Sequence, residues 1–198
     1  MISCTRVQSL NNLITLTEVV LVNETDEQIG TMEKMAAHRN AVLHRAFSVF
    51  IFNGKGEMLL QQRAMRKYHS GGLWTNACCS HPLPGEETLQ AARRRLTEEM
   101  GFETPLKKVF SFIYKSEFDN GLTEYEYDHV YTGVYEGAIY PDKEEVHDYC
   151  YKSMAEIQSS LQSHPRKYTA WFPIAFPLVK KWAEEELSRE PATGLSET

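Results

Sequence analysis

The feature that most constrains the fold is a charged helix that separates two strand-turn-strand patterns. The helix is expected over residues 86–100 and ends at Gly101, with Pro105 beyond it. Before the helix, HRAFSVFIF, NGKG and EMLLQQR predict a hairpin at residues 44–63. After it, KKVFSFIYKSEF, DNG and LTEYEYDHVYTGVY predict a second hairpin at residues 107–135. Strands on both sides of a helix favour an α/β or α+β sandwich around a mixed sheet.

The rest of the chain adds one strand and two helices to this unit. TEVVLVN at residues 17–23 predicts a strand, and Ser153 and Glu156 have the spacing of a capping box at the start of a helix. A last helix is expected over residues 170–188, with a kink at Pro177. No repeat or linker divides the 198 residues, which fit one domain. We expect a loose N-terminal extension at 1–16, the domain at 17–188 and a flexible tail at 189–198.

Composition argues against several classes of function. The net charge of −6 disfavours a general nucleic-acid binder, which needs a basic face, although a local basic cluster would still serve a small anionic substrate. No apolar run approaches the roughly 20 residues that cross a bilayer, and the N-terminus lacks the pattern of a signal peptide. The four cysteines have no regular spacing, and the adjacent Cys78 and Cys79 cannot pair without strain. We therefore expect a protein of the reducing cytoplasm that does not bind membranes.

The central helix carries the first candidate motif. Its stretch ARRRLTEEMGF resembles the latter half of the Nudix box, and alignment on the final glycine places four motif positions on Glu86, Arg94, Glu98 and Glu99. Ser80 stands where the first glycine belongs, and Arg95 replaces a glutamate that helps to hold magnesium in Nudix hydrolases. The resemblance implies a Nudix-like fold and speaks against hydrolysis. A solvated helix end is the alternative, but carboxylates gain nothing from the dipole there.

A second group of carboxylates lies in EYEYD. Residues two apart share a strand face, so Glu124, Glu126 and Asp128 point the same way and repel one another unless a cation or a shared proton relieves them. Two of these glutamates, together with three histidines, would suit a divalent transition metal; the histidines are His38, His44 and His81. A solvated hairpin face and structural histidines are the alternatives.

Several strings together resemble one family. EKMAAH, LHRAFSVFIFN, QQRAMRKYHSGGLWTNACCSHPLPGE, RRRLTEEMG, EYEYDHVY and YTAWF are similar to type I isopentenyl-diphosphate Δ-isomerases over residues 17–185. Members of this family have a single-domain, Nudix-like mixed sheet flanked by helices. They interconvert isopentenyl and dimethylallyl diphosphate by moving a double bond, and they do not hydrolyse diphosphates.

The resemblance implies a role for each matching residue. Cys79 and Glu126 match the two acid/base groups on opposite faces of the substrate, with Tyr114 nearby and Trp171 lining the hydrocarbon pocket. The matched ligands of a manganese or zinc site are His38, His44, His81, Glu124 and Glu126. Glu99 matches a ligand of a second ion, magnesium, that lies in the region of Cys79 and bridges to the diphosphate. The matched diphosphate-binding positions are Lys34, Arg63, Lys67 and Arg95.

The chemistry of the isomerisation needs these residue types. An alkene is a weak base, so its protonation requires a well-placed acid, and a second group must remove a proton from the other side. An indole face can stabilise the intervening carbocation without capturing it, although Trp171 could also be core packing. Two other functions remain open: a Nudix hydrolase of a nucleoside diphosphate derivative, and a non-catalytic metal-binding module. We expect a monomer whose partner is the small isoprenoid diphosphate.

Overall fold

Strand β3 (His44–Phe52) is the central strand of the fold. In a computed structural model, which describes residues 17–67 and 69–189, β3 runs parallel to β8 (Thr123–Val134) along its whole length. On its other edge β3 pairs antiparallel with β6 (Cys78–Ser80). A strand enclosed in this way requires an apolar run, which HRAFSVFIF supplies. The strand brings residues near position 79 and position 126, which are distant in the sequence, to its two sides.

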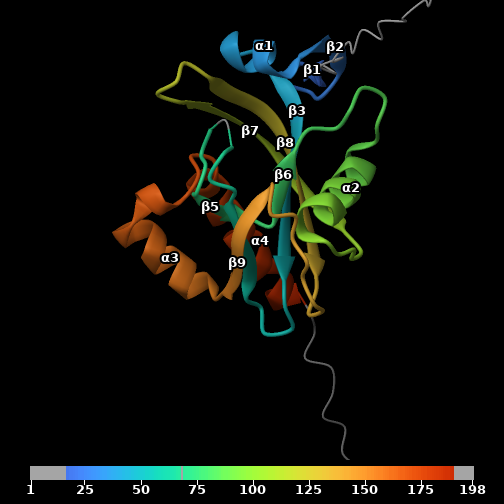
Figure 1. The fold of residues 1–198 in the computed structure, drawn as a ribbon. Coiled ribbons are helices and arrows are strands. Elements are labelled where there is room, and N and C mark those ends of the chain that lie inside the picture. Colours follow the sequence, from blue (N-terminus) through green and yellow to red (C-terminus); the bar gives the residue numbers. More distant parts are fainter. Residues whose placement is uncertain (1–16, 68, 190–198) are drawn as a thin grey trace, which may run out of the picture.

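The described residues form a single nine-stranded mixed sheet (Figure 1). Besides the three strands above, it contains β1 (Glu18–Val22), β2 (Gln28–Glu33), β4 (Met58–Arg63), β5 (Trp74–Asn76), β7 (Lys107–Glu117) and β9 (Val146–Lys152). The pairing of β3 with β8 is parallel, and the other pairings are antiparallel. The mixed sheet that the sequence predicts is therefore confirmed.

The two predicted hairpins differ in how far their strands pair. The second is confirmed, because β7 and β8 pair from Lys107–Thr132 to Glu117–Thr123. The first is right in its turn but wrong in its extent, since β3 and β4 pair only at Phe52–Met58. Strand β6 occupies the edge of β3 along which β4 would have continued, and β4 instead pairs with β5 and β9.

Helices cover both faces of the sheet. Helix α2 (Thr88–Met100) packs its buried Leu96 and Met100 against one face, and Gly101 ends it at a φ of 74°. Helix α4 (Phe172–Arg189) packs Phe172 and Phe176 against the other face. This is the sandwich that the sequence predicts, with helices on both sides of one mixed sheet.

The remaining helices are short. They are α1 (Lys34–Arg39), α3 (Met154–Ser163) and the 3₁₀ turn η1 (Pro165–Lys167). The predicted capping box is confirmed at the start of α3, where Ser153 and Glu156 bond reciprocally. Helix α4 continues past Pro177, and the expected kink stays a prediction.

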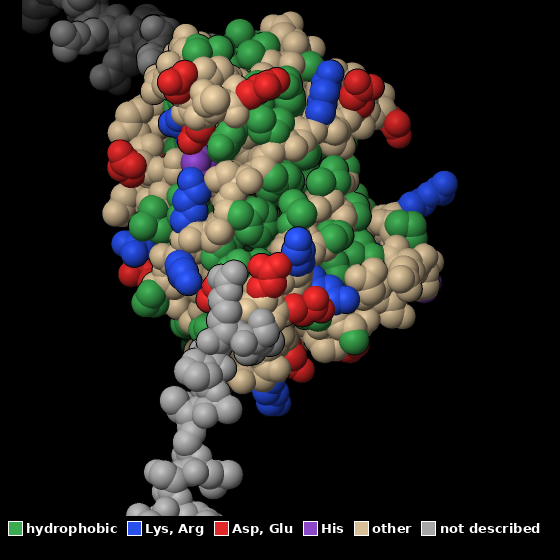
Figure 2. Space-filling view, turned by 180° about the vertical axis from the view of Figure 1, so that it is seen from behind, with side chains coloured by type: hydrophobic (Ala, Val, Ile, Leu, Met, Phe, Trp, Pro, Cys, Tyr) green, Lys and Arg blue, Asp and Glu red, His purple; other side chains and the backbone are tan. Residues whose placement is uncertain are grey.

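Seen from behind, the face that carries α4 shows hydrophobic side chains among basic and acidic ones (Figure 2). Exposed side chains of α4 there include Ile174 and Leu178. No described helix is long and apolar enough to span a membrane. The predicted N-terminal extension and all but the first residue of the predicted tail lie outside the described residues.

Candidate active site

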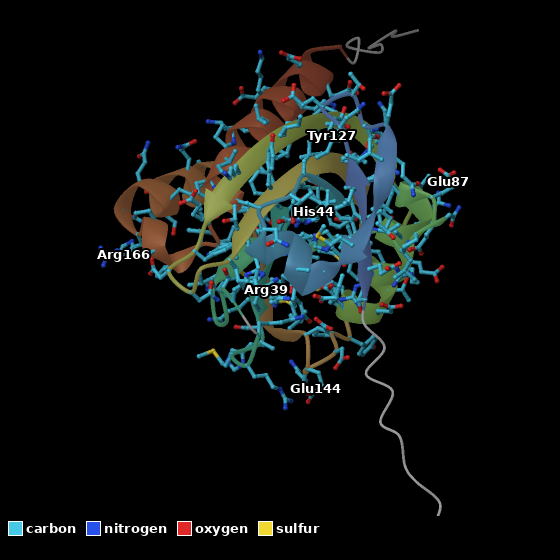
Figure 3. The ribbon with its side chains drawn as sticks, turned by 90° about the horizontal axis from the view of Figure 1, so that it is seen from above. Arg39, His44, Glu87, Tyr127, Glu144 and Arg166 are labelled. Atoms are coloured by element: carbon cyan, nitrogen blue, oxygen red, sulfur yellow. The ribbon has the colours of Figure 1, made fainter. Side chains whose placement is uncertain are left out.

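Three histidines and one glutamate converge at the centre of the molecule, where His44 is labelled in Figure 3. His38 comes from α1, His44 begins β3, His81 follows β6 and Glu126 lies on β8. Their nearest ligand atoms all lie within 4.8 Å of one another. The sheet produces this convergence, because β3 pairs with β8 at His44–Glu126 and with β6 just beyond.

The hydrogen bonds of this group direct its nitrogen lone pairs inwards. The Nδ1 atoms of His38 and His44 donate to the carbonyl oxygens of Lys34 and Val42, at 2.7 and 2.8 Å, which leaves each Nε2 as a free electron pair donor. The Nε2 of His81 lies 3.2 Å from that of His44 and 3.0 Å from Oε1 of Glu126.

The chemistry of the group fits a divalent cation. His38 Nε2 is buried and has no hydrogen-bond partner among the described residues, which is unusual for a polar atom unless an ion completes it. Burial lowers the pKa of His38, and it lowers that of His81 to about 3, so both imidazoles are neutral, as metal ligands must be. Three imidazoles and a carboxylate suit a transition metal better than a hard cation such as calcium.

Glu124 is the predicted ligand that stands apart from this group. Its carboxylate lies 3.1 Å from the hydroxyl of Tyr114 and 3.6 Å from Nε2 of His69. Burial and the neighbouring charge of Glu126 raise the pKa of Glu124 well above its usual range. Its role as a metal ligand stays a prediction.

Glu126 has the opposite electrostatic environment. Burial acts against its charged form, but the nearby imidazoles of His44 and His81, whose Nε2 atoms lie 3.7 and 3.0 Å from Oε1 of Glu126, hold its pKa well below the usual range. The hydroxyl of Tyr114 donates to its second oxygen at 2.6 Å. Beyond it on the same face, Asp128 accepts a hydrogen bond from Ser48 at 2.8 Å, and burial and the charge of Glu126 raise the pKa of Asp128 to about 8.

The two adjacent cysteines face opposite sides of β6. Cys78 is fully buried in the core beneath α2, whereas Cys79 is partly exposed and lines a cavity of about 70 Å³. Glu126, Tyr114 and Trp171 line the same cavity. Burial raises the pKa of Cys79, so its sulfur remains a thiol at neutral pH. A larger hollow of about 810 Å³ lies along α2, and none of the predicted site residues line it.

The lining of the cavity includes several basic side chains. The four predicted diphosphate-binding residues all line it: Lys34, Arg63, Lys67 and Arg95. Arg95 Nη2 donates to Glu99 Oε1 at 2.6 Å, and although burial opposes it, the charge of Glu99 raises the pKa of Arg95. The guanidinium carbon of Arg63 lies 5.4 Å from the ring centroid of Trp171, within cation–π range. Burial lowers the pKa of Lys34.

Several residues at or beside the cavity, Ser80 among them, have no predicted role in binding or catalysis. His69 lines it, stacks on Phe118 at 4.9 Å between ring centroids and meets Trp171 edge-on at 6.0 Å. Gln61, on the buried strand β4, donates to Glu99 Oε2 at 3.1 Å. Glu145, just before β9, forms ion pairs with Lys67 and Arg95. A polar residue directly after the apolar run MLL, on the same strand, is a signal for Gln61, whereas His69 and Glu145 have no comparable signal in the sequence.

The fold and the site define the class of protein. A structure from Deinococcus radiodurans superposes with a TM-score of 0.67 over 83% of this chain and 98% of its own, and a MutT protein from Methanosarcina mazei with 0.57 over 73% and 95%. At 18% and 19% identity these likenesses show the fold alone. The family description "NUDIX domain" matches residues 42–172, and the chain is a Nudix-domain protein.

Two relatives narrow the class. An isopentenyl-diphosphate Delta-isomerase of Pectobacterium atrosepticum is 53% identical over 83% of this chain and 92% of its own length. A second, of Aromatoleum aromaticum, is 47% identical over 82% and 86%. The chain belongs to the isopentenyl-diphosphate Delta-isomerase family. The predicted family and fold are thus confirmed.

Proposed function

We propose that this enzyme interconverts isopentenyl diphosphate and dimethylallyl diphosphate, in isoprenoid biosynthesis, by adding one proton to the substrate and removing another. The observation that carries the mechanism is that Cys79 and Glu126 line one small cavity from strands on opposite edges of β3. The names of the relatives support the isomerase over a Nudix hydrolase of a nucleoside diphosphate derivative.

The basic lining residues of the cavity are suited to the diphosphate. Four basic side chains face it, and a diphosphate carries enough negative charge to pair with several of them at once. Holding the diphosphate there would fix where the five-carbon chain lies, so the reacting carbons reach the other residues of the cavity. This role accounts for Arg95 at the position of a Nudix-box glutamate, because a guanidinium attracts the diphosphate and a carboxylate would repel it.

Cys79 and Glu126 are suited to move the protons. At rest one is a protonated thiol and the other a carboxylate, so the pair holds one donor and one acceptor. In either direction one group gives a proton to an alkene carbon, which leaves a tertiary carbocation, and the other takes a proton from the carbon on the far side of the cationic centre. The hydroxyl of Tyr114 contacts both Glu124 and Glu126. It orients the carboxylate of Glu126 and can relay a proton between Glu126 and Glu124.

The carbocation must be kept from water until it loses its proton. Trp171 is 3% exposed and lines the cavity, and an indole ring attracts a cation that lies against its face. The small volume of the cavity excludes bulk water, which would otherwise add to the cation as an alcohol.

One cluster of the residues present fits a transition metal, and we propose a second metal site at Glu99. His38, His44, His81 and Glu126 would hold manganese or zinc, with Glu124 as a further ligand, and Glu99 would hold magnesium near Cys79. When bound, these ions supply positive charge that lowers the proton affinity of Glu126 and neutralises the diphosphate. We further propose that the enzyme acts as a cytoplasmic monomer, without nucleic-acid or membrane partners.

The function is tested by incubating the purified protein with isopentenyl diphosphate and magnesium. We expect an allylic product, recognised because acid hydrolyses it rapidly while the substrate survives. Inorganic phosphate released without an allylic product would support the hydrolase, and metal binding without any turnover would support a non-catalytic module.

A further inference from the structure

Glu145 links two of the cations that face the cavity. One of its carboxylate oxygens forms an ion pair with the ammonium of Lys67, and the other lies 3.5 Å from Nη2 of Arg95. Lys67 belongs to the loop between β4 and β5, Arg95 to α2, and Glu145 to the turn before β9. A single carboxylate therefore connects three segments that are distant in the sequence.

The backbone around Glu145 is held on both sides. Its carbonyl oxygen accepts a hydrogen bond from the backbone N–H of Ala64 at 2.9 Å, at the end of β4. Its own N–H donates to the carbonyl oxygen of Asp142 at 3.0 Å, and the N–H of Asp142 donates to that of Glu99 at 3.0 Å. The carboxylate is thus anchored to the two segments that carry Lys67 and Arg95.

Glu145 lies behind these cations. Lys67 and Arg95 line the cavity, whereas Glu145 is not among the described residues that do so. The three side chains are 21–25% exposed, so solvent only partly screens their attraction. A free lysine side chain samples many rotamers, and holding it in one before the ligand arrives reduces the entropy lost on binding.

We propose that Glu145 is a positioning residue for diphosphate binding: it fixes Lys67 and Arg95 at the cavity before the substrate enters. The role rests on the proposed function and assigns to that site a carboxylate that never touches the substrate. It acts on binding in the ground state and the transition state alike, because the diphosphate keeps its charge while the double bond moves.

A neighbouring ion pair supplies a matched control. Arg66 and Glu144 join the same loop to the same turn, one residue away from Lys67 and Glu145 respectively. Their side chains are 68% and 66% exposed, and Glu144 lies at the lower edge of the molecule in Figure 3, away from His44. Glu144→Gln therefore removes the same charge and a similar loop contact without touching the cations of the cavity.

The experiment compares Glu145→Gln with Glu144→Gln in the full chain. We expect Glu145→Gln to raise KM for isopentenyl diphosphate about threefold to tenfold with kcat nearly unchanged, the pattern of lost uniform binding. Glu144→Gln should change neither. A KM that stays the same or falls in Glu145→Gln, or a loss confined to kcat, would overturn the proposal.

Two further measurements separate positioning from a general loss of structure. In a Lys67→Met background Glu145→Gln should raise KM by a clearly smaller factor, because one of the side chains it positions is gone; an undiminished factor would contradict the role. Calorimetric titration with inorganic diphosphate should show the same weakening in Glu145→Gln without any turnover. If the wild-type protein binds diphosphate but forms no allylic product, the proposed function fails and this titration still decides the role of Glu145.

Discussion

Replacing each of the adjacent cysteines by alanine removes the same atom from two opposite environments. The sulfur of Cys78 lies in the core beneath α2, near Leu96 and Met100, and is not accessible to solvent. Cys79, in contrast, lines the cavity that Glu126 also lines. We therefore expect Cys78→Ala to lower stability and to leave activity unchanged. Cys79→Ala should abolish activity and leave stability nearly unchanged.

The structure sets the size of both effects. Removing one buried, sulfur-sized group from a packed core costs about 1 kcal/mol or slightly more, including the small cavity that remains. In a chain of 198 residues this lowers Tm by roughly 2–4 °C. Losing a general acid or base slows the chemical step by roughly 10²- to 10⁴-fold, so Cys79→Ala should have almost no isomerase activity.

Two assays on the same preparations decide the outcome. Initial rates of allylic product formation are measured at saturating isopentenyl diphosphate, and Tm is measured by calorimetry or circular dichroism. Equal losses of activity in the two variants, or a greater loss in Cys78→Ala, would refute the assignment of the second cysteine. An active Cys79→Ala enzyme would refute the mechanism as a whole.

Four other predictions follow from the site and the fold. Glu126→Gln should abolish isomerisation and weaken metal retention in elemental analysis; full metal content would remove Glu126 from the ligand set. Arg95→Glu should chiefly raise KM for the diphosphate, and an unchanged KM would exclude Arg95 from binding. Ser153→Ala removes the cap of α3 and should cost about 1 kcal/mol in the free energy of unfolding at full activity. The proton of Asp128 gives stability that is complete below its ordinary pKa of 3.8 and is lost as pH rises through about 8, so in metal-free protein Asp128→Asn should flatten the fall of Tm between these values; an unchanged slope would contradict this.

Local patterns in the sequence predict the local parts of the fold well. The helix before Gly101, the hairpin of β7 and β8 and the capping box at Ser153 each depend on residues close together in the chain. The extent of the first hairpin was wrong because β6, three residues long, displaces β4 from β3. Neither that short strand nor the parallel pairing of β3 with β8 has a local signal, since both depend on contacts across the molecule.

In the candidate site, too, some residues can be predicted from the sequence and others cannot. The resemblance singles out Cys79, Glu126 and the basic residues because these positions have distinctive neighbours in the sequence, and all of them line one cavity. It gave no indication of His69 or Glu145, whose importance comes from side chains that approach from distant loops. Nor does alternation along EYEYD distinguish Glu124, which contacts Tyr114 and His69, from Glu126, which joins the histidines.

Strand β3 sets the position of Cys79 relative to Glu126 along the sheet. Its His44 pairs with Glu126 on one edge and its Ser48 pairs with Cys79 on the other, so four residue steps set their offset. Extra residues in the turns at 53–56 and 119–121 would leave that offset untouched. One extra residue between His44 and Ser48 would point either the thiol or the carboxylate away from the substrate, and we expect such an insertion to yield a folded protein without activity.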